Sequence, residues 1–500
     1  MAVTTKQAAP TPEQLQSVWG ALKSPRRLKT EVLGGLVVGL ALIPEAIAFS
    51  VIAGVDPRIG LFAAFTMAVT IAFTGGRPAM ISAATGAVAL VIAPLVRSHG
   101  VDYLIACVIL AGVLQIILAL AGVAKLMRFI PRSVMVGFVN ALAILVFIAQ
   151  LPELIGVPWL VYPLVAAALL IMFVLPRFTQ VVPAPLVAIV VLTLVAVLAN
   201  IAVPTVGDKG ALPDSLPTAM VPNVPLTFET LQVIFPFALA MAFVGLLESL
   251  MTAKLVDDIT DTRSSKTREA WGQGVANIVT GFFGGMGGCA MIGQTMINVK
   301  ASGARTRIST FCAGVFLLLL VVVLGDVVSL IPMAALVAVM IFVCWATFDW
   351  HSIRPRTLKA LPKSESFVMV ATVVATVATN NLAIGVGTGT VLAMVMFARR
   401  VAHFVTVERI EGDGVATYVV NGELFFASSN DLYTQFAYAL DPERVVIDMR
   451  SSHLWDASTS ATLDAITDKY RRHGKDVEIV GLNQASTEMR RRLAGKLGGN

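Results

Sequence analysis

Two carboxyl groups stand inside stretches of the sequence that are otherwise almost entirely apolar. Glu45 follows Pro44, a residue that removes a backbone hydrogen bond and loosens a helix, and Glu248 stands beside Ser249. A charged carboxylate is costly inside a membrane, so burial favours the protonated form and allows proton exchange near neutral pH. We therefore predict that Glu45 and Glu248 are proton-coupling groups. The alternative is that each is a structural carboxylate paired with a neighbouring polar group.

Two short apolar segments that follow glycines have the pattern of an anion site. The first follows Gly75 and Gly76 and carries Pro78 where a helix would take its first turn, and the second follows Gly287 and Gly288. A helix that starts inside a membrane exposes unpaired N–H groups and a partial positive charge. Two facing helix starts therefore bind an anion without a charged side chain. The alternative is that the glycines only allow helices to pack closely.

These two segments supply most of the predicted substrate site. We align them on Ala79–Ile81 and Ala290–Ile292, because both stretches read Ala-Met-Ile. The predicted site joins both segments to two residues of the first apolar stretch: Glu45, Phe49, Ala79, Met80, Ile81, Ser82, Met291, Ile292, Gly293, Gln294 and Thr295. Its amide and hydroxyl groups offer hydrogen bonds, and Phe49 offers an apolar wall.

The composition places these groups in a membrane rather than in water. Hydrophobic residues make up 57% of the chain, charged residues only 14%, and the mean hydropathy is +0.82. Soluble proteins carry about one quarter charged residues, so a water-soluble globular protein is excluded. The net charge of +6 is spread between apolar stretches and forms no basic stripe. This distribution argues for contact with membrane lipid and against a nucleic acid partner.

Apolar runs suited to membrane helices recur from residue 31 to residue 402, and they form two sets of seven. The first set is predicted at 31–53, 58–74, 78–95, 103–124, 133–152, 157–175 and 182–202, and the second at 230–253, 270–284, 289–299, 306–324, 329–349, 365–380 and 382–402. An odd number of crossings per half implies halves of inverted orientation. The predicted domains are an N-terminus at 1–30, a membrane repeat at 31–203, an extracellular connection at 204–229, a second repeat at 230–404 and a soluble domain at 405–500.

The distribution of basic residues predicts the orientation of the chain. With fourteen crossings and both termini in the cytoplasm, every lysine and arginine before Val401 lies on the cytoplasmic side except Arg58, Arg97 and Lys209. The positive-inside rule requires such an asymmetry, and changing the number of crossings by one would destroy it. We predict a multi-pass protein of the bacterial cytoplasmic membrane with both termini inside.

The sequence carries no pattern for a cofactor, a metal ion or an enzyme active site. The four cysteines lie in or beside apolar stretches without paired spacing, and we interpret them as small core residues: Cys107, Cys289, Cys312 and Cys344. The five histidines are scattered, and no phosphate-binding Gly-x4-Gly-Lys-Ser/Thr loop occurs. We expect neither a cofactor nor an enzymatic activity.

Beyond about Val405 the sequence alternates apolar and charged residues, which is typical of a soluble domain. Strands are predicted at 415–421, 443–449 and 477–482, a helix at 458–472, and a last, basic helix that carries Arg490, Arg491 and Arg492. Strands that alternate with helices over about a hundred residues predict a small α/β domain.

Several motifs together resemble the sulfate permease family of anion transporters, also called solute carrier family 26. The stretches 44–49 and 53–61 resemble the family signature near the N-terminus, and 248–260 and 298–306 resemble later motifs. The C-terminal domain resembles the STAS domain (sulfate transporter and anti-sigma-factor antagonist) that members carry in the cytoplasm. The resemblance implies a seven-plus-seven inverted repeat with core and gate subdomains, and a substrate site between the third and tenth segments, flanked by the first and eighth. It also implies homodimers and an elevator-like movement.

Three positions depart from patterns that are common in this family. Glu45 stands where many animal members have glutamine, which resembles a proton-coupled plant and bacterial branch. Gln294 stands where many animal exchangers have arginine, which makes chloride exchange less expected. Ala457 replaces the serine that is phosphorylated in antagonist relatives, which argues against a phosphorylation switch.

Together these features predict an α-helical polytopic membrane protein, with a small cytoplasmic α/β domain, that moves a small anion together with protons. The leading substrate is a C4-dicarboxylate such as fumarate or succinate, and the expected partners are protons, membrane lipid and a second copy of the chain. A sulfate or bicarbonate transporter of the same family is the first alternative. A nucleobase carrier, an anion channel and a membrane-anchored signalling protein also stay open.

Overall fold

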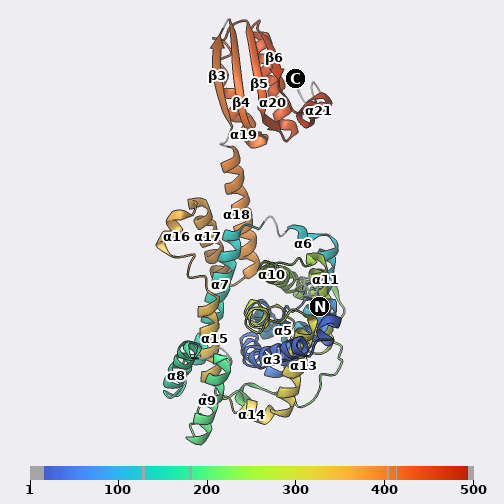
Figure 1. The fold of residues 1–500 in the computed structure, drawn as a ribbon, viewed down its shortest axis with the longest axis vertical. Coiled ribbons are helices and arrows are strands. Elements are labelled where there is room, and N and C mark those ends of the chain that lie inside the picture. Colours follow the sequence, from blue (N-terminus) through green and yellow to red (C-terminus); the bar gives the residue numbers. More distant parts are fainter. Residues whose placement is uncertain (1–15, 127–129, 179–182, 403–404, 413, 494–500) are drawn as a thin grey trace, which may run out of the picture. The chain divides into compact units, whose positions relative to one another are not determined.

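The computed structural model describes residues 16–126, 130–178, 183–402, 405–412 and 414–493. The chain divides into two units, Met1–Thr390 and Val391–Asn500. Figure 1 shows the first as a bundle of helices and the second as a sheet with helices beside it. Among the described helices, six are long and apolar enough to cross a membrane, so we call the first unit the membrane unit.

Six long helices of the membrane unit pack against one another and are called the core bundle: α3 (Pro25–Ala53), α4 (Pro57–Thr74), α5 (Gly86–Leu120), α10 (Phe228–Thr260), α11 (Lys266–Phe282) and α13 (Arg307–Val323). The side chains of Thr85, Thr227 and Ser265 accept backbone N–H hydrogen bonds at the starts of α5, α10 and α11. Helix α5 bends at Gly100, where a φ of 82° suits glycine, so this one element covers the third and fourth predicted segments.

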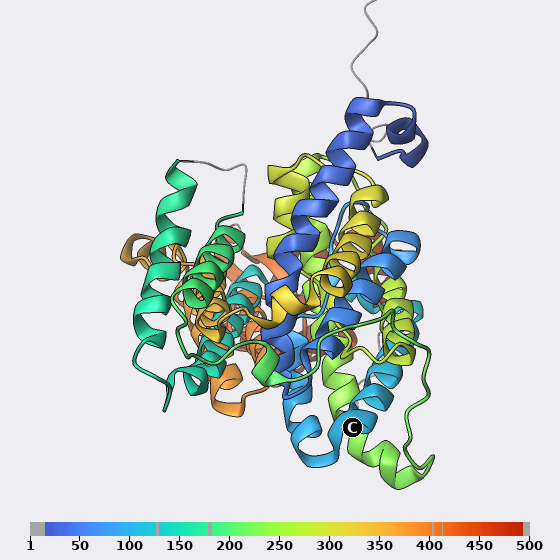
Figure 2. The ribbon, with the colours of Figure 1, turned by 90° about the horizontal axis from the view of Figure 1, so that it is seen from below.

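A second group of helices is called the gate bundle: α7 (Arg132–Gln150), α8 (Val161–Val174), α9 (Ala184–Leu198), α15 (Met333–Thr347) and α17 (Lys363–Thr379). Figure 2 shows the teal and green α8 and α9 to one side of the blue α3. Helix α18 (Leu382–Ala402) starts in the membrane unit and ends in the second unit. Short helical elements connect the long ones: α2 (Val18–Leu22), α6 (Val123–Leu126), η2 (Leu151–Leu154), η3 (Leu175–Arg177), η4 (Gly207–Lys209), α14 (Gly325–Ser329) and α16 (Pro355–Ala360).

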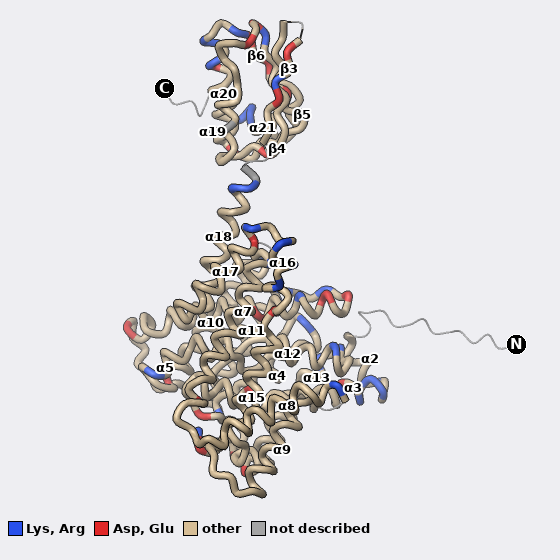
Figure 3. The backbone as a smooth tube through the Cα atoms, turned by 90° about the vertical axis from the view of Figure 1, so that its left-hand side faces the viewer, with Lys and Arg blue, Asp and Glu red and all other residues tan. Residues whose placement is uncertain are grey.

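Helical elements overlap each apolar run that the sequence assigned to the membrane. Figure 3 shows long uncharged stretches along these helices, with most Lys, Arg, Asp and Glu residues near their ends and in the second unit. The predicted helical membrane fold is therefore confirmed. The inverted relation between the two halves stays a prediction.

Two short strands meet where the sequence predicted two helix starts. β1 (Ser82–Ala83) pairs antiparallel with β2 (Cys289–Ala290). Helix α5 starts only after β1, at Gly86, and not at Pro78 as expected. After β2, α12 (Ile292–Met296) runs directly into the π-helix η5 (Ile297–Ala301). The two segments therefore meet through residues 82–83 and 289–290, and the alignment on Ala79–Ile81 stays a prediction.

The irregular backbone before β1 is held by a buried carboxylate of α11. Glu269 Oε2 accepts hydrogen bonds from the backbone N–H groups of Gly76 at 2.7 Å and Arg77 at 2.9 Å. Gln273 Nε2 donates to Glu269 Oε1 at 2.9 Å and to Ser82 Oγ at 2.7 Å. These bonds satisfy two backbone N–H groups that precede Pro78. Glu269 and Gln273 therefore hold a segment that is not helical before β1.

Two of the glycines in these segments allow close backbone contact. A Cβ atom at Gly288 would lie 1.9 Å from the carbonyl oxygen of Ala83, and one at Gly76 would lie 2.1 Å from that of Ser265. A side chain at either position would therefore push two backbone segments apart. For Gly76 and Gly288 the geometry favours the alternative of close packing.

The second unit contains a four-stranded sheet in the order β3 (Thr406–Gly412), β4 (Val415–Leu424), β5 (Arg444–Leu454), β6 (Asp476–Val480). β3 pairs antiparallel with β4, and the other pairs are parallel. Three helices complete the unit: α19 (Phe426–Thr434), α20 (Ala457–Arg472) and α21 (Gln484–Leu493). Inward residues of β4 and β5, such as Tyr418 and Ile447, pack with Leu463 and Tyr470 of α20. The predicted α/β domain is confirmed, with β3 and α19 as additional elements.

Candidate functional site

A cavity of about 1150 Å³ lies between the core bundle and the gate bundle. The core bundle contributes residues of α3 and α10 and the start of α5, and α12 and η5 complete this side. The gate bundle contributes residues of α7, α9 and α15. The cavity wall therefore contains residues of the first, third, eighth and tenth predicted segments.

The cavity extends toward the end of the membrane unit at which α3 begins. Thr30 and Leu33 of the first turns of α3 line it, as do Pro176 after α8, Pro183 before α9 and Thr347 at the end of α15. In the topology predicted from the basic residues, all five positions lie on the cytoplasmic side of the membrane. The cavity is thus a one-sided vestibule.

At the other end of the membrane unit, residues 204–212 connect the two bundles. Ala211 accepts a backbone hydrogen bond from Arg58 of the core bundle at 3.1 Å. Lys209 forms an ion pair with Glu153, which follows α7 of the gate bundle, at 2.7 Å. These contacts hold the two bundles together on the side away from the cavity entrance.

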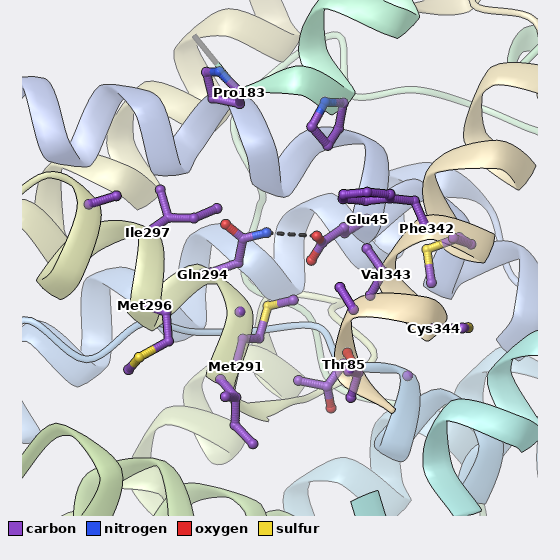
Figure 4. Close-up of a pocket in the computed structure, with 18 of the residues that line it drawn as sticks. Glu45, Thr85, Pro183, Met291, Gln294, Met296, Ile297, Phe342, Val343 and Cys344 are labelled. Carbon is purple, nitrogen blue, oxygen red and sulfur yellow. Dashed lines mark hydrogen bonds between the residues drawn. The ribbon is translucent and has the colours of Figure 1, made fainter. Parts of the chain in front are cut away.

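The first carboxyl group of the cavity is paired with a single amide. Gln294 Nε2 donates to Glu45 Oε1 at 2.7 Å, and both side chains are buried, with 8% of Glu45 and 2% of Gln294 exposed. Figure 4 shows the amide nitrogen turned toward Glu45 and the amide oxygen turned away from it. That oxygen, Oε1, is buried without a hydrogen-bond partner among the described residues.

The second carboxyl group has a thiol as its partner. Cys289 Sγ donates to Glu248 Oε2 at 2.9 Å, and Thr85 Oγ1 lies 3.1 Å from the same sulfur. A thiol has one hydrogen, so the Thr85 hydroxyl donates to the sulfur while accepting the backbone N–H of Val88. Glu248 is connected in this way to the residue that caps α5. Cys289 is therefore more than the small core residue that the sequence suggested.

The electrostatic character of the cavity follows from its lining. Among the described residues that line it there is no Lys, Arg or His, and the ionisable ones are Glu45, Glu248 and Cys344. Most of the remaining wall is apolar and aromatic, including Phe49 of α3 and Phe138 of α7. A Cβ atom at Gly293 would meet nothing within 4 Å, so the backbone of α12 borders open space. Positive potential comes from the N–H groups at the starts of α5 and of the helical run 292–301.

The structure brings together part of the predicted site. Seven predicted residues line the cavity: Glu45, Phe49, Glu248, Met291, Ile292, Gly293 and Gln294. Five do not: Ala79, Met80, Ile81, Ser82 and Thr295. Met80 packs against buried alanines, Thr295 Oγ1 accepts the N–H of Ile81 at 3.0 Å, and Ser82 is bonded to Gln273. These five hold the crossing of β1 and β2 in place behind the wall.

Several wall residues escaped sequence reasoning. Thr85 and Gly86 line the cavity in place of the residues expected from the first short segment. The sequence pattern that could have predicted them is a threonine, a common N-cap residue, directly before the apolar run that forms α5. Phe138 of α7 and Phe342 of α15 are ordinary apolar residues in the sequence and gave no signal. Among the described residues, no group of three or more His, Cys, Asp or Glu side chains is placed to hold a metal ion.

The sequence profile of the sulfate permease family matches residues 28–162 and 158–372, and that of the STAS domain matches residues 406–494. The chain belongs to the sulfate permease family. YbaR of Bacillus subtilis (strain 168), named as a candidate sulfate transporter, is 54% identical over 93% of this chain and 97% of its own length. The bicarbonate transporter BicA of Picosynechococcus sp. is 25% identical over 94% of this chain and 90% of its own length.

Solved structures of other family members share the fold. The murine Slc26a9 anion transporter in an inward-facing state superposes with a TM-score of 0.81 at 16% identity, over 98% of this chain and 92% of that one. The transmembrane domain of a cyanobacterial BicA superposes with a TM-score of 0.64 at 24% identity, over 72% of this chain and 98% of that one. This sulfate permease family member is therefore a multi-pass anion transporter with a C-terminal STAS domain.

Proposed function

We propose that this transporter is a proton-coupled anion symporter of the bacterial cytoplasmic membrane. One observation carries the proposal: the described wall of the cavity holds two carboxyl groups, Glu45 and Glu248, and no cationic side chain. An anion that enters beside an ionised carboxylate is repelled, by about 4 kcal/mol for charges 4 Å apart at an effective dielectric constant near 20. Protonation of the carboxyl groups removes that repulsion. The anion therefore enters together with protons.

The leading substrate is a C4-dicarboxylate such as fumarate or succinate. The starts of α5 and of the helical run 292–301 supply N–H groups for a carboxylate, and the aromatic wall suits an apolar carbon chain. The names of relatives favour a second candidate, because YbaR is named for sulfate and BicA for bicarbonate. Sulfate and bicarbonate offer the same oxygen acceptors without the apolar body.

The proposal includes an orientation and a state. With both termini in the cytoplasm, the cavity entrance beside Thr30 and Thr347 faces inward, and residues 204–212 close the outer side. The substrate would be released from this state into the cytoplasm. A homodimer is expected from the family resemblance. Glu45, Glu248, Phe49 and Gln294 are the residues proposed to contact or sense the substrate.

Uptake into proteoliposomes tests this function. Radiolabelled sulfate, bicarbonate, fumarate and succinate are offered separately and in competition, with an inward proton gradient and the membrane voltage held at zero. The proposal expects saturable accumulation of one of them that depends on the gradient and is lost in Glu45→Gln. Accumulation that Glu45→Gln leaves unchanged would refute the role of Glu45. Currents that rise linearly with substrate concentration would indicate a channel instead.

A further inference from the structure

The Gln294 side chain leaves one of its two ends without a partner. Its Nε2 donates to Glu45 Oε1 at 2.7 Å, while its Oε1 is buried and has no hydrogen-bond partner among the described residues. Leaving a buried acceptor unpaired costs about 1–3 kcal/mol, so a donor that meets this oxygen in another state would stabilise that state. Gln294 lines the cavity, where a transported anion must pass.

The chemistry of the pair determines which end of the amide faces Glu45. An ionised carboxylate only accepts hydrogen bonds, so it holds the amide by its NH₂ group, as the structure shows. A protonated carboxyl group carries an O–H that needs an acceptor, and the amide oxygen is that acceptor. The NH₂ and C=O ends of an amide have nearly the same size and shape, so reversing it requires no repacking of the wall.

We infer that the Gln294 amide is the switch through which protonation of Glu45 creates an anion-binding donor. When Glu45 is ionised, Gln294 turns its oxygen toward the unpaired position, and an acceptor there repels an anion. A proton taken up from cavity water forms an O–H bond on Glu45. The amide of Gln294 rotates, so that its Oε1 accepts this O–H and its Nε2 takes the place that Oε1 occupied before. The N–H groups of Gln294 Nε2 can then donate to an oxygen of the anion.

This inference rests on the proposed symport and gives it a linkage mechanism. The proton favours the orientation that binds the anion, and the bound anion satisfies donors that would otherwise be buried unpaired. Each ligand therefore raises the affinity for the other by the same factor. Coupling arises here from the direction of hydrogen bonds as well as from charge, and Gln294 is the positioning residue between the two ligands.

Other titratable groups near Glu45 do not explain the arrangement. On the cavity wall these are Glu248 of α10 and Cys344 of α15, and Glu248 is bonded to Cys289 instead. Helices α9 and α12, which pack against α3, carry no titratable residue. The neighbouring elements α4, α5, α13 and η5 carry theirs off the cavity wall, for example Arg58, Cys107, Cys312 and Lys300.

The test measures the affinity of the purified full-length protein for radiolabelled succinate, with radiolabelled sulfate in parallel, at about pH 6 and about pH 8.5. In the unmodified protein the proposed symport requires tighter binding at the acidic pH. Gln294→Met keeps the length of the side chain and removes both ends of the amide. We expect its affinity at the acidic pH to fall about tenfold, the value of a hydrogen bond to a charged acceptor. We also expect the ratio between the two pH values to fall about tenfold, while the part that comes from charge repulsion remains.

A second pair of variants separates the switch from simple charge repulsion. Glu45→Gln presents an NH₂ donor to Gln294 Oε1 and fixes the anion-binding orientation, so its affinity should be high and should lose the part of the pH dependence that comes from Glu45. Adding Gln294→Met to Glu45→Gln should weaken binding about tenfold at both pH values. If charge repulsion alone operates, Gln294→Met will keep the full pH ratio and will have no effect beside Glu45→Gln. That result overturns the inference.

The control is Gln115→Met, which removes a buried amide from α5 that does not line the cavity and accepts a bond from Asn277 instead. Its pH ratio should equal that of the unmodified protein. Gln294→Leu repeats the test if Gln294→Met does not fold, since both remove the amide. An unmodified protein without a pH ratio would refute the proposed symport, whereas a ratio retained in both Gln294 variants would refute only the switch.

Discussion

The two units each bury a carboxylate, but they surround it with different partners. Asp441 in the C-terminal domain is 5% exposed and accepts hydrogen bonds from Tyr470 Oη at 2.6 Å, Tyr418 Oη at 2.7 Å and Arg409 Nε at 2.8 Å. Glu45 in the membrane unit is 8% exposed and has one neutral donor, the amide of Gln294. The exposed fractions of the two residues are similar, but their hydrogen-bond partners differ.

The partners decide whether a buried carboxylate keeps its charge. Burial opposes the ionisation of Asp441, but the hydrogen bonds from Tyr470, Tyr418 and Arg409 outweigh burial and hold the pKa of that carboxyl below its usual value. Glu45 has no cation to compensate its charge on the described cavity wall. Asp441 is therefore a fixed structural charge, while Glu45 is suited to take up and release a proton. The same residue chemistry serves architecture in one unit and, in the proposed symport, coupling in the other.

The largest effect is expected from changing the fixed carboxylate. Asp441→Asn replaces an acceptor oxygen with an NH₂ group that faces hydroxyl and guanidinium donors, and we expect it to destabilise the C-terminal domain by about 2–4 kcal/mol. Hydrogen exchange of the β4 amides in the full-length protein measures this. The pH ratio of substrate affinity in the membrane unit should not change. A changed ratio would contradict the separation of the two roles.

The next largest effect is expected from the exchanging carboxylate. Each coupled proton lets a gradient of about one pH unit support about tenfold accumulation, since one unit corresponds to about 1.4 kcal/mol. If Glu45 is the coupling group, Glu45→Gln should reduce the accumulation ratio in proteoliposomes to about one while binding persists. Unfolding of the C-terminal domain should be unaffected. The control is again Gln115→Met, which changes a buried side chain of the same bundle off the cavity wall and leaves both carboxyl groups in place.

Glu248 lies between these extremes, with one weak donor and a link to the start of α5. Cys289→Ala removes the donor and the contact with Thr85, and we expect the rate of uptake to fall about threefold to tenfold, the value of a net hydrogen bond. Cys289→Ser preserves a donor and should retain most of the rate. Equal rates in the alanine and serine variants would mean that the thiol only fills space.

The smallest effect is expected from the pH dependence of domain stability. The pKa of Asp441 is lowered on folding, so its stabilisation is complete above the unfolded value of about 3.9 and is lost as the pH falls through the lower folded value. Hydrogen exchange of the C-terminal domain, corrected for its intrinsic rate, should be flat from about pH 6 to about pH 8. Affinity for the substrate should change over the same interval. Faster corrected exchange of the C-terminal domain across that interval would contradict the assignment of Asp441 as a fixed charge.

The fold was largely predictable because apolar length and the placement of basic residues are strong signals. The helices α3, α4 and α7 begin or end within a few residues of the predicted limits, and α20 spans almost the same residues as predicted. Two elements of the C-terminal domain were not anticipated. β3 has mostly exposed side chains and therefore shows little apolar alternation. α19 is a short helix of 9 residues with few apolar side chains, so it lacks a clear apolar face.

The site was predictable only where a residue was chemically out of place. Glu45, Glu248 and Gln294 are polar in apolar segments, and the structure places all three on the cavity wall. Met80 and Ser82 were misplaced because Met80 packs against buried alanines and Ser82 is bonded to Gln273, which lies far away in the sequence. Local propensity does not contain such a long-range bond. The wall on the side of the gate bundle consists of apolar residues such as Phe342. These residues line the cavity only because the two bundles pack against each other, which the sequence does not reveal.

The most direct test of the central claim measures anion and proton fluxes in the same proteoliposomes. Radiolabelled succinate and sulfate report the anion, and a pH-sensitive dye trapped inside reports the protons, with the voltage held at zero. A cavity whose described wall holds two carboxyl groups and no cationic side chain predicts that uptake acidifies the interior by at least about one proton per anion, and that Glu45→Gln abolishes this acidification. Saturable anion uptake without any proton movement would contradict the account.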